Sequence, residues 1–306
     1  MGKIAFVFSG QGAQYSGMGS SLYHTSSKAK TLYESAEAIR PGTMAQSFEG
    51  TDDELKITEN TQPCLYLVDL SAALALNEAG IYADGAAGFS LGEVAALAYA
   101  GAYSHDDGFR IVSKRGQLMS KAAEGADTAM CAVLKMAPAD VEEAVKEFDK
   151  LYAVNFNSPV QTVVSGLKSS IDAFMEKAKS LGGRCIPLAV SAAFHSPFMD
   201  EASAGFAEEL KDYNIVSPQI PVYANMDAKP YALNAAQMLP KQIVSPVRWA
   251  DTIQNMIADG YTDFIEVGAG KTLCGLIKKI SSEVNVYSVE DADTLKATVE
   301  AVKANA

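Results

Sequence analysis

The chain has 306 residues, of which 48% are hydrophobic and 20% are charged. This length and apolar content predict one large domain with an insertion and exclude an intrinsically disordered protein. The formal net charge of −12 argues against nonspecific binding to nucleic acid or to an anionic membrane, so neither is expected as a partner.

The cysteines and the start of the chain indicate a compartment. The four cysteines, at positions 64, 131, 185 and 274, form no C-x-x-C pair. That spacing predicts neither a metal site nor a disulfide framework and favours a reducing environment. The first residues lack the layout of a signal peptide, and no uninterrupted apolar run reaches the length of a membrane span. We therefore expect a cytoplasmic protein.

The N-terminal third alternates buried strands with long helices. An apolar run at residues 4–9 predicts a strand buried on both faces, followed by a loop over 10–15. A helix is predicted over 62–78, a strand over 85–89, and two helices over 91–101 and 104–125. The loop does not fit a dinucleotide-binding turn, because Tyr15 stands where the third glycine is required.

Residues 127–190 have a different pattern and predict a self-contained insertion. The expected order is strand 128–134, helix 139–148, strand 151–155, strand 162–165, helix 169–181 and strand 184–189. This β-α-β-β-α-β order describes a small ferredoxin-like subdomain.

The remaining residues, 191–306, return to longer α/β elements. Helices are predicted over 197–213, 235–244, 247–259, 272–282 and from about 293, and strands over 220–223, 263–267 and 284–289. Strands that alternate with helices imply a mostly parallel sheet covered on both faces. Residues 1–126 and 191–306 are therefore expected to form one large, hydrolase-like α/β subdomain that carries 127–190 as its insertion.

A Gly-x-Ser-x-Gly sequence at residues 88–92 lies where the second predicted strand meets the next helix. This pattern is typical of a nucleophile elbow, whose sharp turn strains the central residue and leaves room only for glycine two positions away. Ser90 would then project at a helix N-terminus, with the N–H of Leu91 placed to bind an oxyanion. A plain turn is the alternative, and a nucleophilic serine also requires a base.

Of the three histidines, only one fits the role of the base. His24 lies in a polar stretch and His105 lies beside two aspartates, so both are expected to be solvated. His195 precedes Ser196 and Pro197, which fit the N-cap and the first position of a helix whose dipole would keep the imidazole neutral. A buried structural histidine is the alternative. No acidic third member is marked, so a main-chain carbonyl is expected to hold the ring in a Ser–His dyad.

Arg115 interrupts an apolar stripe on the helix predicted over residues 104–125. Phe109, Val112 and Met119 share that stripe at helical spacing. A guanidinium on a buried stripe is costly unless it is paired, and its best partner is a carboxylate. Two interpretations stay open: a structural bridge to an Asp or Glu of the chain, or a partner that arrives with the substrate.

Five motifs stand in order along the chain: GQGAQ with Gln11, GFSLGE with Ser90, RGQLM from Arg115, AVNFNSP with Asn155 and Asn157, and AFHSPFM with His195. PVRW at 246–249 and EVGAG at 266–270 extend the set. Together they resemble the malonyl-CoA:acyl carrier protein transacylase family over nearly the whole chain. That family has a large α/β subdomain with a ferredoxin-like insertion, in agreement with the predicted order of elements.

The resemblance implies a role for each of these residues. Ser90 would be acylated, His195 would be the base, and the main-chain N–H groups of Gln11 and Leu91 would form the oxyanion hole. Arg115 would bind the free carboxylate of the malonyl group. The other implied site residues are Met119 and Asn157, which would bind substrate, Phe194, whose ring would leave little room for an α-methyl branch, and Gln242, whose carbonyl would orient the histidine.

The implied activity is transfer of a malonyl group from malonyl-CoA to the phosphopantetheine thiol of an acyl carrier protein, through a malonyl-serine intermediate, for fatty-acid synthesis. No metal or cofactor is implied. The partners would be CoA thioesters and the carrier protein. A local basic surface for the carrier is hypothesised at Lys271, Lys278 and Lys279, with Lys114 or Lys241 near the mouth; ordinary solvated lysines are the alternative. A monomer is expected. The alternatives are an acyltransferase of a polyketide synthase, a catalytically silent docking subunit and an α/β-hydrolase esterase, although an esterase would leave Arg115 without a role.

Overall fold

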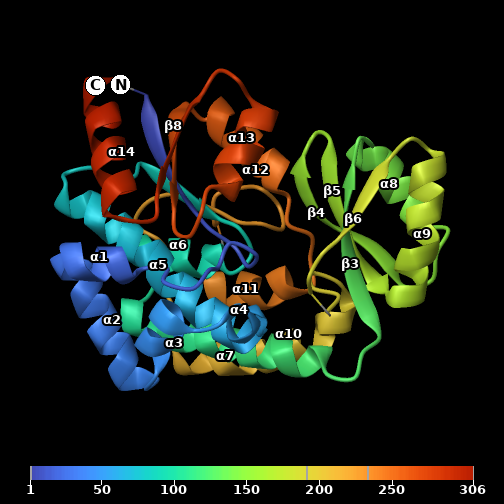
Figure 1. The fold of residues 1–306 in the computed structure, drawn as a ribbon, viewed down its shortest axis with the longest axis horizontal. Coiled ribbons are helices and arrows are strands. Elements are labelled where there is room, and N and C mark those ends of the chain that lie inside the picture. The colour runs from blue at the N-terminus through green and yellow to red at the C-terminus, as the bar shows by residue number, and fades with distance from the viewer. Residues whose placement is uncertain (1, 191, 233, 306) are drawn as a thin grey trace.

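The computed structural model describes residues 2–190, 192–232 and 234–305. Its larger part is built on a five-stranded parallel sheet in the order β7-β2-β1-β8-β9 (Figure 1). The strands are β1 (Lys3–Phe8), β2 (Gly85–Gly88), β7 (Val222–Tyr223), β8 (Tyr261–Val267) and β9 (Asn285–Val289). The predicted strands of this sheet are confirmed, with ends that differ by one or two residues.

The carboxyl ends of β1 and β2 bring two predicted site loops together. Phe8 and Gly88 are register partners of this parallel pair. The loop that carries Gln11 and the turn that carries Ser90 therefore leave the same edge of the sheet. In open α/β sheets this edge is where ligands bind.

The helices of the larger part differ from the prediction in two respects besides the positions of their ends. Residues 20–56, for which no element is predicted above, form four helices. The single helix predicted over 197–213 is wrong, because the Ser196–Pro197 start produces a short 3-10 turn (Pro197–Met199) before the α-helix begins, and a second such turn (Leu210–Asp212) ends it. The helices are α1 (Ser20–Thr25), α2 (Ser27–Ile39), α3 (Thr43–Glu49), α4 (Asp52–Lys56), α5 (Thr58–Glu78), α6 (Gly92–Tyr99), α7 (His105–Ala123), α10 (Asp200–Glu209), α11 (Ala235–Ile243), α12 (Trp249–Ala258), α13 (Thr272–Ile280) and α14 (Ala292–Ala304).

Alternate side chains of β1 enter two separate apolar cores. Phe6 and Phe8 belong to the larger core, which also holds buried side chains of α5 and α7. Ala5 and Val7 belong to a second core with Trp249 and other side chains of α12 and α13. This alternation is expected of a strand whose successive side chains point to opposite faces, and helices cover both faces of the sheet (Figure 1).

The insertion is a four-stranded antiparallel sheet in the order β4-β5-β3-β6. Its elements are β3 (Thr128–Leu134), α8 (Pro138–Val145), β4 (Leu151–Ser158), β5 (Gln161–Leu167), α9 (Lys168–Ser180) and β6 (Arg184–Pro187). Cys131 and Val133 pack with Phe174 in a core of their own, whereas Met130 and Ala132 on the opposite face join the larger core. The ferredoxin-like order is confirmed, and the sheet turns its helix-free face toward the rest of the protein (Figure 1).

The subdomain boundaries at 126/127 and 190/191 stay a prediction, and residue 191 lies outside the described residues. Within the three described segments, no helix is long and apolar enough to cross a bilayer. The same segments contain no cluster of three or more His, Cys, Asp or Glu side chains that could hold a metal ion.

Candidate active site

Ser90 lies in a strained turn between β2 and α6. Its φ is +55°, a left-handed value that is uncommon for a residue with a side chain. A Cβ on Gly88 would lie 1.9 Å from the carbonyl carbon of Gly92, and one on Gly92 would lie 2.4 Å from the oxygen of Phe8. Only glycine fits at these two positions, which is the packing that a nucleophile elbow requires.

The hydroxyl of Ser90 faces the imidazole of His195. Ser90 Oγ lies 2.8 Å from His195 Nε2. On the other side of the ring, Nδ1 lies 3.0 Å from the carbonyl oxygen of Gln242 and 3.1 Å from that of Ser245. A carbonyl only accepts, so Nδ1 carries the proton and the lone pair of Nε2 points at the serine. This tautomer is the one that a general base needs.

Burial keeps the base neutral. His195 is 4% exposed, and desolvation lowers its pKa to about 4, with a further contribution from the positive charge of Arg115. A contribution from the helix dipole stays a prediction, because the 3-10 turn after His195 leads directly into α10.

Two backbone N–H groups beside the dyad have no acceptor among the described residues. Gln11 lines the same small cavity as Ser90 and His195, and Leu91 directly follows the serine. No described residue accepts a hydrogen bond from the N–H of either. Leu91 is buried and Gln11 is partly buried, and N–H groups without a protein acceptor at this position are available to an oxyanion that forms on an acyl group at Ser90.

Arg115 lies on α7 and is 0% exposed. Its Nη1 donates to Gln62 Oε1 (2.9 Å), and its Nη2 donates to Gln242 Oε1 (2.8 Å) and to Ser90 Oγ (3.3 Å). Among the described residues no carboxylate lies within ion-pair distance of the guanidinium, and its Nε has no hydrogen-bond partner. Of the two interpretations above, a direct bridge to an Asp or Glu is therefore not what the structure contains.

The remaining predicted site residues do not all lie at the dyad. Met119 and Phe194 line the cavity with Ser90. Asn157 does not; it is buried in an adjoining groove beside Gln11 and Asn155, and its Oδ1 has no partner. The cavity at the dyad has a volume of about 90 Å³ and is lined by Gln11, Phe89, Ser90, Met119, Met130, Asn155, Leu188, Val190, Phe194 and His195.

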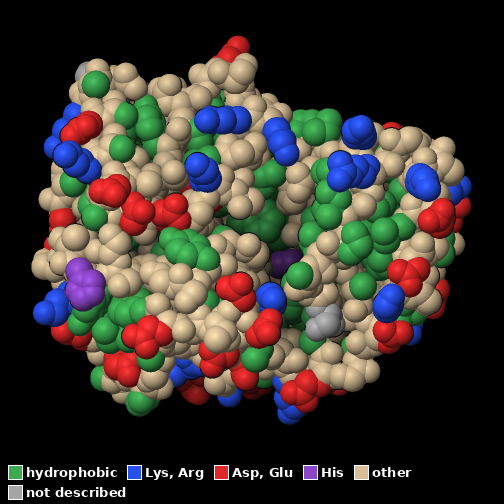
Figure 2. All heavy atoms as spheres, viewed as in Figure 1, with side chains coloured by type: hydrophobic (Ala, Val, Ile, Leu, Met, Phe, Trp, Pro, Cys, Tyr) green, Lys and Arg blue, Asp and Glu red, His purple; other side chains and the backbone are tan. Residues whose placement is uncertain are grey.

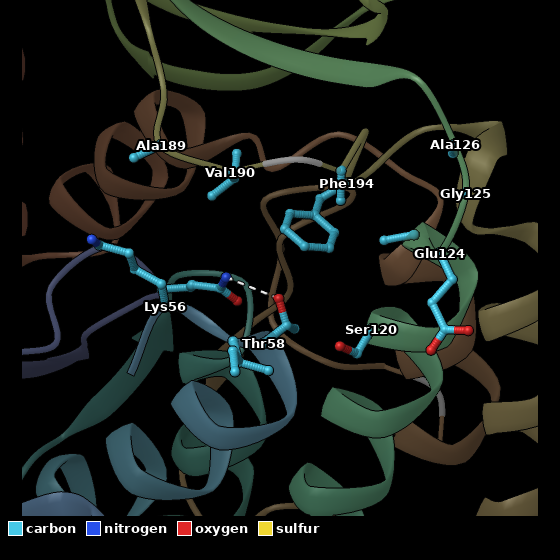
Figure 3. A pocket seen from close by; sticks show the side chains of 13 residues that line it. Lys56, Thr58, Ser120, Glu124, Gly125, Ala126, Ala189, Val190 and Phe194 are labelled. Atoms are coloured by element: carbon cyan, nitrogen blue, oxygen red, sulfur yellow. Dashed lines mark hydrogen bonds between the residues drawn. The ribbon is translucent and has the colours of Figure 1, made fainter. Parts of the chain in front are cut away.

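A larger cleft of about 540 Å³ adjoins this cavity and shares Gln11, Val190 and Phe194 with it. Figure 3 shows the ring of Phe194 pointing into that cleft, opposite Thr58 and Ser120. Gln11 also lines it, and its side chain donates to Thr58 Oγ1 at 3.1 Å. A space-filling view shows a hollow between the larger part and the insertion, with histidine atoms at its floor (Figure 2). The dyad is thus reached from a cleft at the junction of the two parts.

Three buried polar residues near the elbow and Arg115 were not found from the sequence. Asn225 accepts from the N–H of Ser90 (2.8 Å) and donates to the carbonyl of Gly88 (2.6 Å). Glu93, one helical turn after the serine, accepts from the backbone N–H of Asn225 (2.9 Å) and from the side chain of Gln242 (3.1 Å). Gln62 pairs with Arg115. Only Glu93 carried a signal, since a charged residue within the apolar helix α6 is expected to have a buried partner.

The other two histidines lie elsewhere. His24 is exposed, as expected. The expectation for His105 is wrong: it is half-buried, because α2 and α5 pack over the start of α7, and its carbonyl accepts from Tyr66 Oη at 2.8 Å.

Comparisons of the sequence and of the structure with known proteins all find acyl transferases. Residues 5–299 match the acyl transferase domain family. The chain is 38% identical to the malonyl CoA-acyl carrier protein transacylase of Bacillus subtilis (strain 168), over 99% of this chain and 98% of that protein. The crystal structure of the malonyl CoA-acyl carrier protein transacylase from Clostridium perfringens ATCC 13124 superposes with a TM-score of 0.95, at 34% identity, covering 99% of this chain and 98% of that one. A malonyl-transacylase in complex with its type II PKS acyl-carrier protein gives a TM-score of 0.92 at 31% identity, covering 98% and 99%.

Proposed function

The chain belongs to the acyl transferase domain family, and from that premise we propose that it transfers a malonyl group from malonyl-CoA to the phosphopantetheine thiol of an acyl carrier protein. One observation carries the choice of malonyl: the buried guanidinium of Arg115 lies 3.3 Å from the nucleophilic oxygen, and no carboxylate of the described residues lies within ion-pair distance of it. An acyl group that ends in a carboxylate supplies the missing partner.

The first half-reaction acylates Ser90. His195 Nε2 takes the proton of the hydroxyl as Oγ attacks the thioester carbon, and the oxyanion accepts hydrogen bonds from the N–H groups of Gln11 and Leu91. The carbon–sulfur bond then breaks, and the coenzyme A thiolate takes the proton from His195. The products are a malonyl-serine ester and free coenzyme A.

The second half-reaction runs the same steps in reverse with a different thiol. The phosphopantetheine thiol of the carrier protein gives its proton to His195, and its sulfur attacks the ester. The Ser90 oxygen leaves and recovers the proton, which regenerates the enzyme. The carbonyl of Gln242 accepts from Nδ1–H throughout and stabilises the imidazolium that forms in each step.

Nucleophile, base and carboxylate anchor all come from the chain, so this chemistry needs no metal or cofactor. We further propose a cytoplasmic monomer that takes CoA thioesters and carrier protein as partners and binds neither nucleic acid nor membranes. The pathway is fatty-acid supply. Service to a polyketide synthase is the second candidate, because one structural neighbour was solved with such a carrier.

Acyl carrier proteins are usually acidic, so docking of the carrier on this acidic protein requires a local basic surface. Lys271, Lys278 and Lys279 are exposed on and before α13, and we propose them as that surface. Lys114 is a weaker candidate than expected, because it forms an ion pair with Glu209 (3.8 Å). Reversal of charge at Lys278 and Lys279 should raise the apparent KM for the carrier and leave the loading of Ser90 by malonyl-CoA unchanged; an unchanged KM would remove this surface.

Intact-mass analysis tests the proposed function. The protein is incubated with malonyl-CoA, and the expected product is a malonyl adduct that disappears on addition of a holo carrier protein. Ser90→Ala is the matched control and should show no adduct. Release of free malonate instead of transfer would favour the esterase, and no adduct at all would favour a silent docking subunit. A panel of fatty-acid and polyketide carriers then distinguishes the two pathways.

A further inference from the structure

Two buried residues of opposite charge lie behind the nucleophile, and a single amide separates them. Arg115 is 0% exposed and Glu93 is 1% exposed. Gln242 connects them, because its Oε1 accepts from Arg115 Nη2 (2.8 Å) and its Nε2 donates to Glu93 Oε2 (3.1 Å). Neither charge has a closer partner of opposite sign in the described part of the chain.

The surroundings of Glu93 supply donors but no cation in direct contact. The backbone N–H of Asn225 and the hydroxyl of Tyr231 donate to its carboxylate, in addition to Gln242. Burial raises the pKa of Glu93 to about 7, and these donors and the charge of Arg115 hold it from rising further. The carboxylate can therefore gain a proton at modest cost in the physiological range.

The charges of the site can be counted in each state. In the free enzyme, ionised Glu93 and the guanidinium of Arg115 sum to zero. A malonyl group on Ser90 adds a second carboxylate beside the same guanidinium, so the buried site would carry one uncompensated negative charge, which is unfavourable in a medium of low dielectric. An acetyl group adds no charge.

We propose that capture of the malonyl carboxylate is coupled to the uptake of one proton by Glu93, so that the preference for malonyl over acetyl groups depends on pH. This inference rests on the proposed function of Arg115. Glu93 does not touch the reacting atoms; it is a positioning residue that sets the charge of the acyl site through Gln242.

The titratable groups that surround Glu93, Arg115 included, keep their charge between pH 6 and 9. Desolvation lowers the pKa of His195 to about 4, so it is neutral there, and lowers that of Arg115 to about 10, so it stays charged. Burial raises the pKa values of Tyr103 and Tyr231 well above the usual range, so both stay neutral. Among the described titratable groups of this site, Glu93 is therefore the one whose charge changes between pH 6 and 9.

The test is the ratio of kcat/KM for malonyl-CoA to that for acetyl-CoA in loading Ser90, measured from pH 6 to 9. Both substrates carry the same coenzyme A phosphates and use the same dyad, so those titrations cancel in the ratio. Because malonyl loading takes up a proton at Glu93, the ratio depends on whether that proton is already bound. Below about pH 7 Glu93 is protonated in the free enzyme and the ratio is level. Above this pH the ratio falls, and the slope approaches tenfold per pH unit for the uptake of one full proton.

Glu93→Gln keeps the size of the side chain and removes its titration, so the ratio should become independent of pH. Tyr231→Phe keeps Glu93 and removes a donor that lowers its pKa, so the fall should begin at higher pH; this variant carries the test if Glu93→Gln does not fold. A level ratio in the unmodified protein, a slope that survives in Glu93→Gln, or an unshifted fall in Tyr231→Phe overturns the coupling. Absence of any malonyl adduct at every pH would instead overturn the proposed function.

Discussion

Replacement of Arg115 by alanine tests the assignment of the acyl group most directly. The guanidinium is fully buried and directs Nη2 toward both Gln242 and the nucleophilic oxygen. A malonyl carboxylate that accepts two hydrogen bonds from it gains about 1.5–3 kcal/mol from each, since the donor is charged. At about 1.4 kcal/mol for each factor of ten, the loss of both should lower kcat/KM for malonyl-CoA by about 10²–10⁴-fold.

Acetyl transfer should respond differently, because an acetyl group makes no contact with the cation. We expect Arg115→Ala to leave kcat/KM for acetyl-CoA within a few-fold of the original value or to raise it. Stopped reactions analysed by intact mass, with malonyl-CoA and acetyl-CoA in parallel, measure both constants on one sample. Arg115→Lys is the matched control, because it keeps the charge and loses the forked geometry. Its kcat/KM for malonyl-CoA should lie between that of the unmodified protein and that of Arg115→Ala.

The variant will also be less stable, and this effect must be separated from the kinetic one. Alanine leaves Gln62 Oε1 and Gln242 Oε1 without their donor, at about 1–3 kcal/mol for each buried acceptor. A thermal melt should therefore show a lower Tm, and the kinetics should be measured well below it. Equal losses with malonyl-CoA and acetyl-CoA in folded protein would show that Arg115 does not recognise the carboxylate.

Three further predictions concern the rest of the site. Phe194→Ala should raise the ratio of methylmalonyl to malonyl loading by about 10–100-fold in a competition assay, because the ring limits the space beside the acyl group; an unchanged ratio would place the selectivity elsewhere. Because the base must be neutral and burial lowers the pKa of His195 to about 4, the rate of acetyl loading should be level from pH 6 to 8 and halve only near pH 4; a midpoint near 6.5 would contradict the burial argument. Gly88→Ala should abolish loading or folding, because its Cβ would lie 1.9 Å from the backbone of Gly92; a folded, active variant would show that the elbow can relax.

Local signals were sufficient to predict the elbow and the central strands. The turn chemistry of Gly88 and Gly92 is determined within five residues of chain, and β1 is an apolar run that is buried on both faces. The base was predicted because only three histidines were available and a helix-start pattern surrounded one of them. In each case the constraint lies close in sequence to the residue that it concerns.

The polar network behind the elbow could not be predicted in this way. Asn225 is 135 residues from Ser90, and Gln242 is 152 residues away. Their roles depend on how β7 and α11 are placed against α6, which no local pattern encodes. The prediction of one continuous helix over 197–213 was wrong for a different reason: the Ser196–Pro197 start is correct, but it opens a 3-10 turn instead of an α-helix, and a second 3-10 turn ends the element.

Both members of the dyad are held in left-handed backbone conformations, with φ of +55° at Ser90 and +58° at His195. Such residues cost about 1–3 kcal/mol each and persist only where surrounding contacts fix them. Gln242 supplies contacts to both: its side chain donates to the Ser90 carbonyl (2.7 Å) and its own carbonyl accepts from His195. The same side chain also accepts from Arg115. One residue therefore connects the strained nucleophile, the base and the cation, so a change at Gln242 must affect every acyl group, whereas a change at Arg115 acts on the charged one.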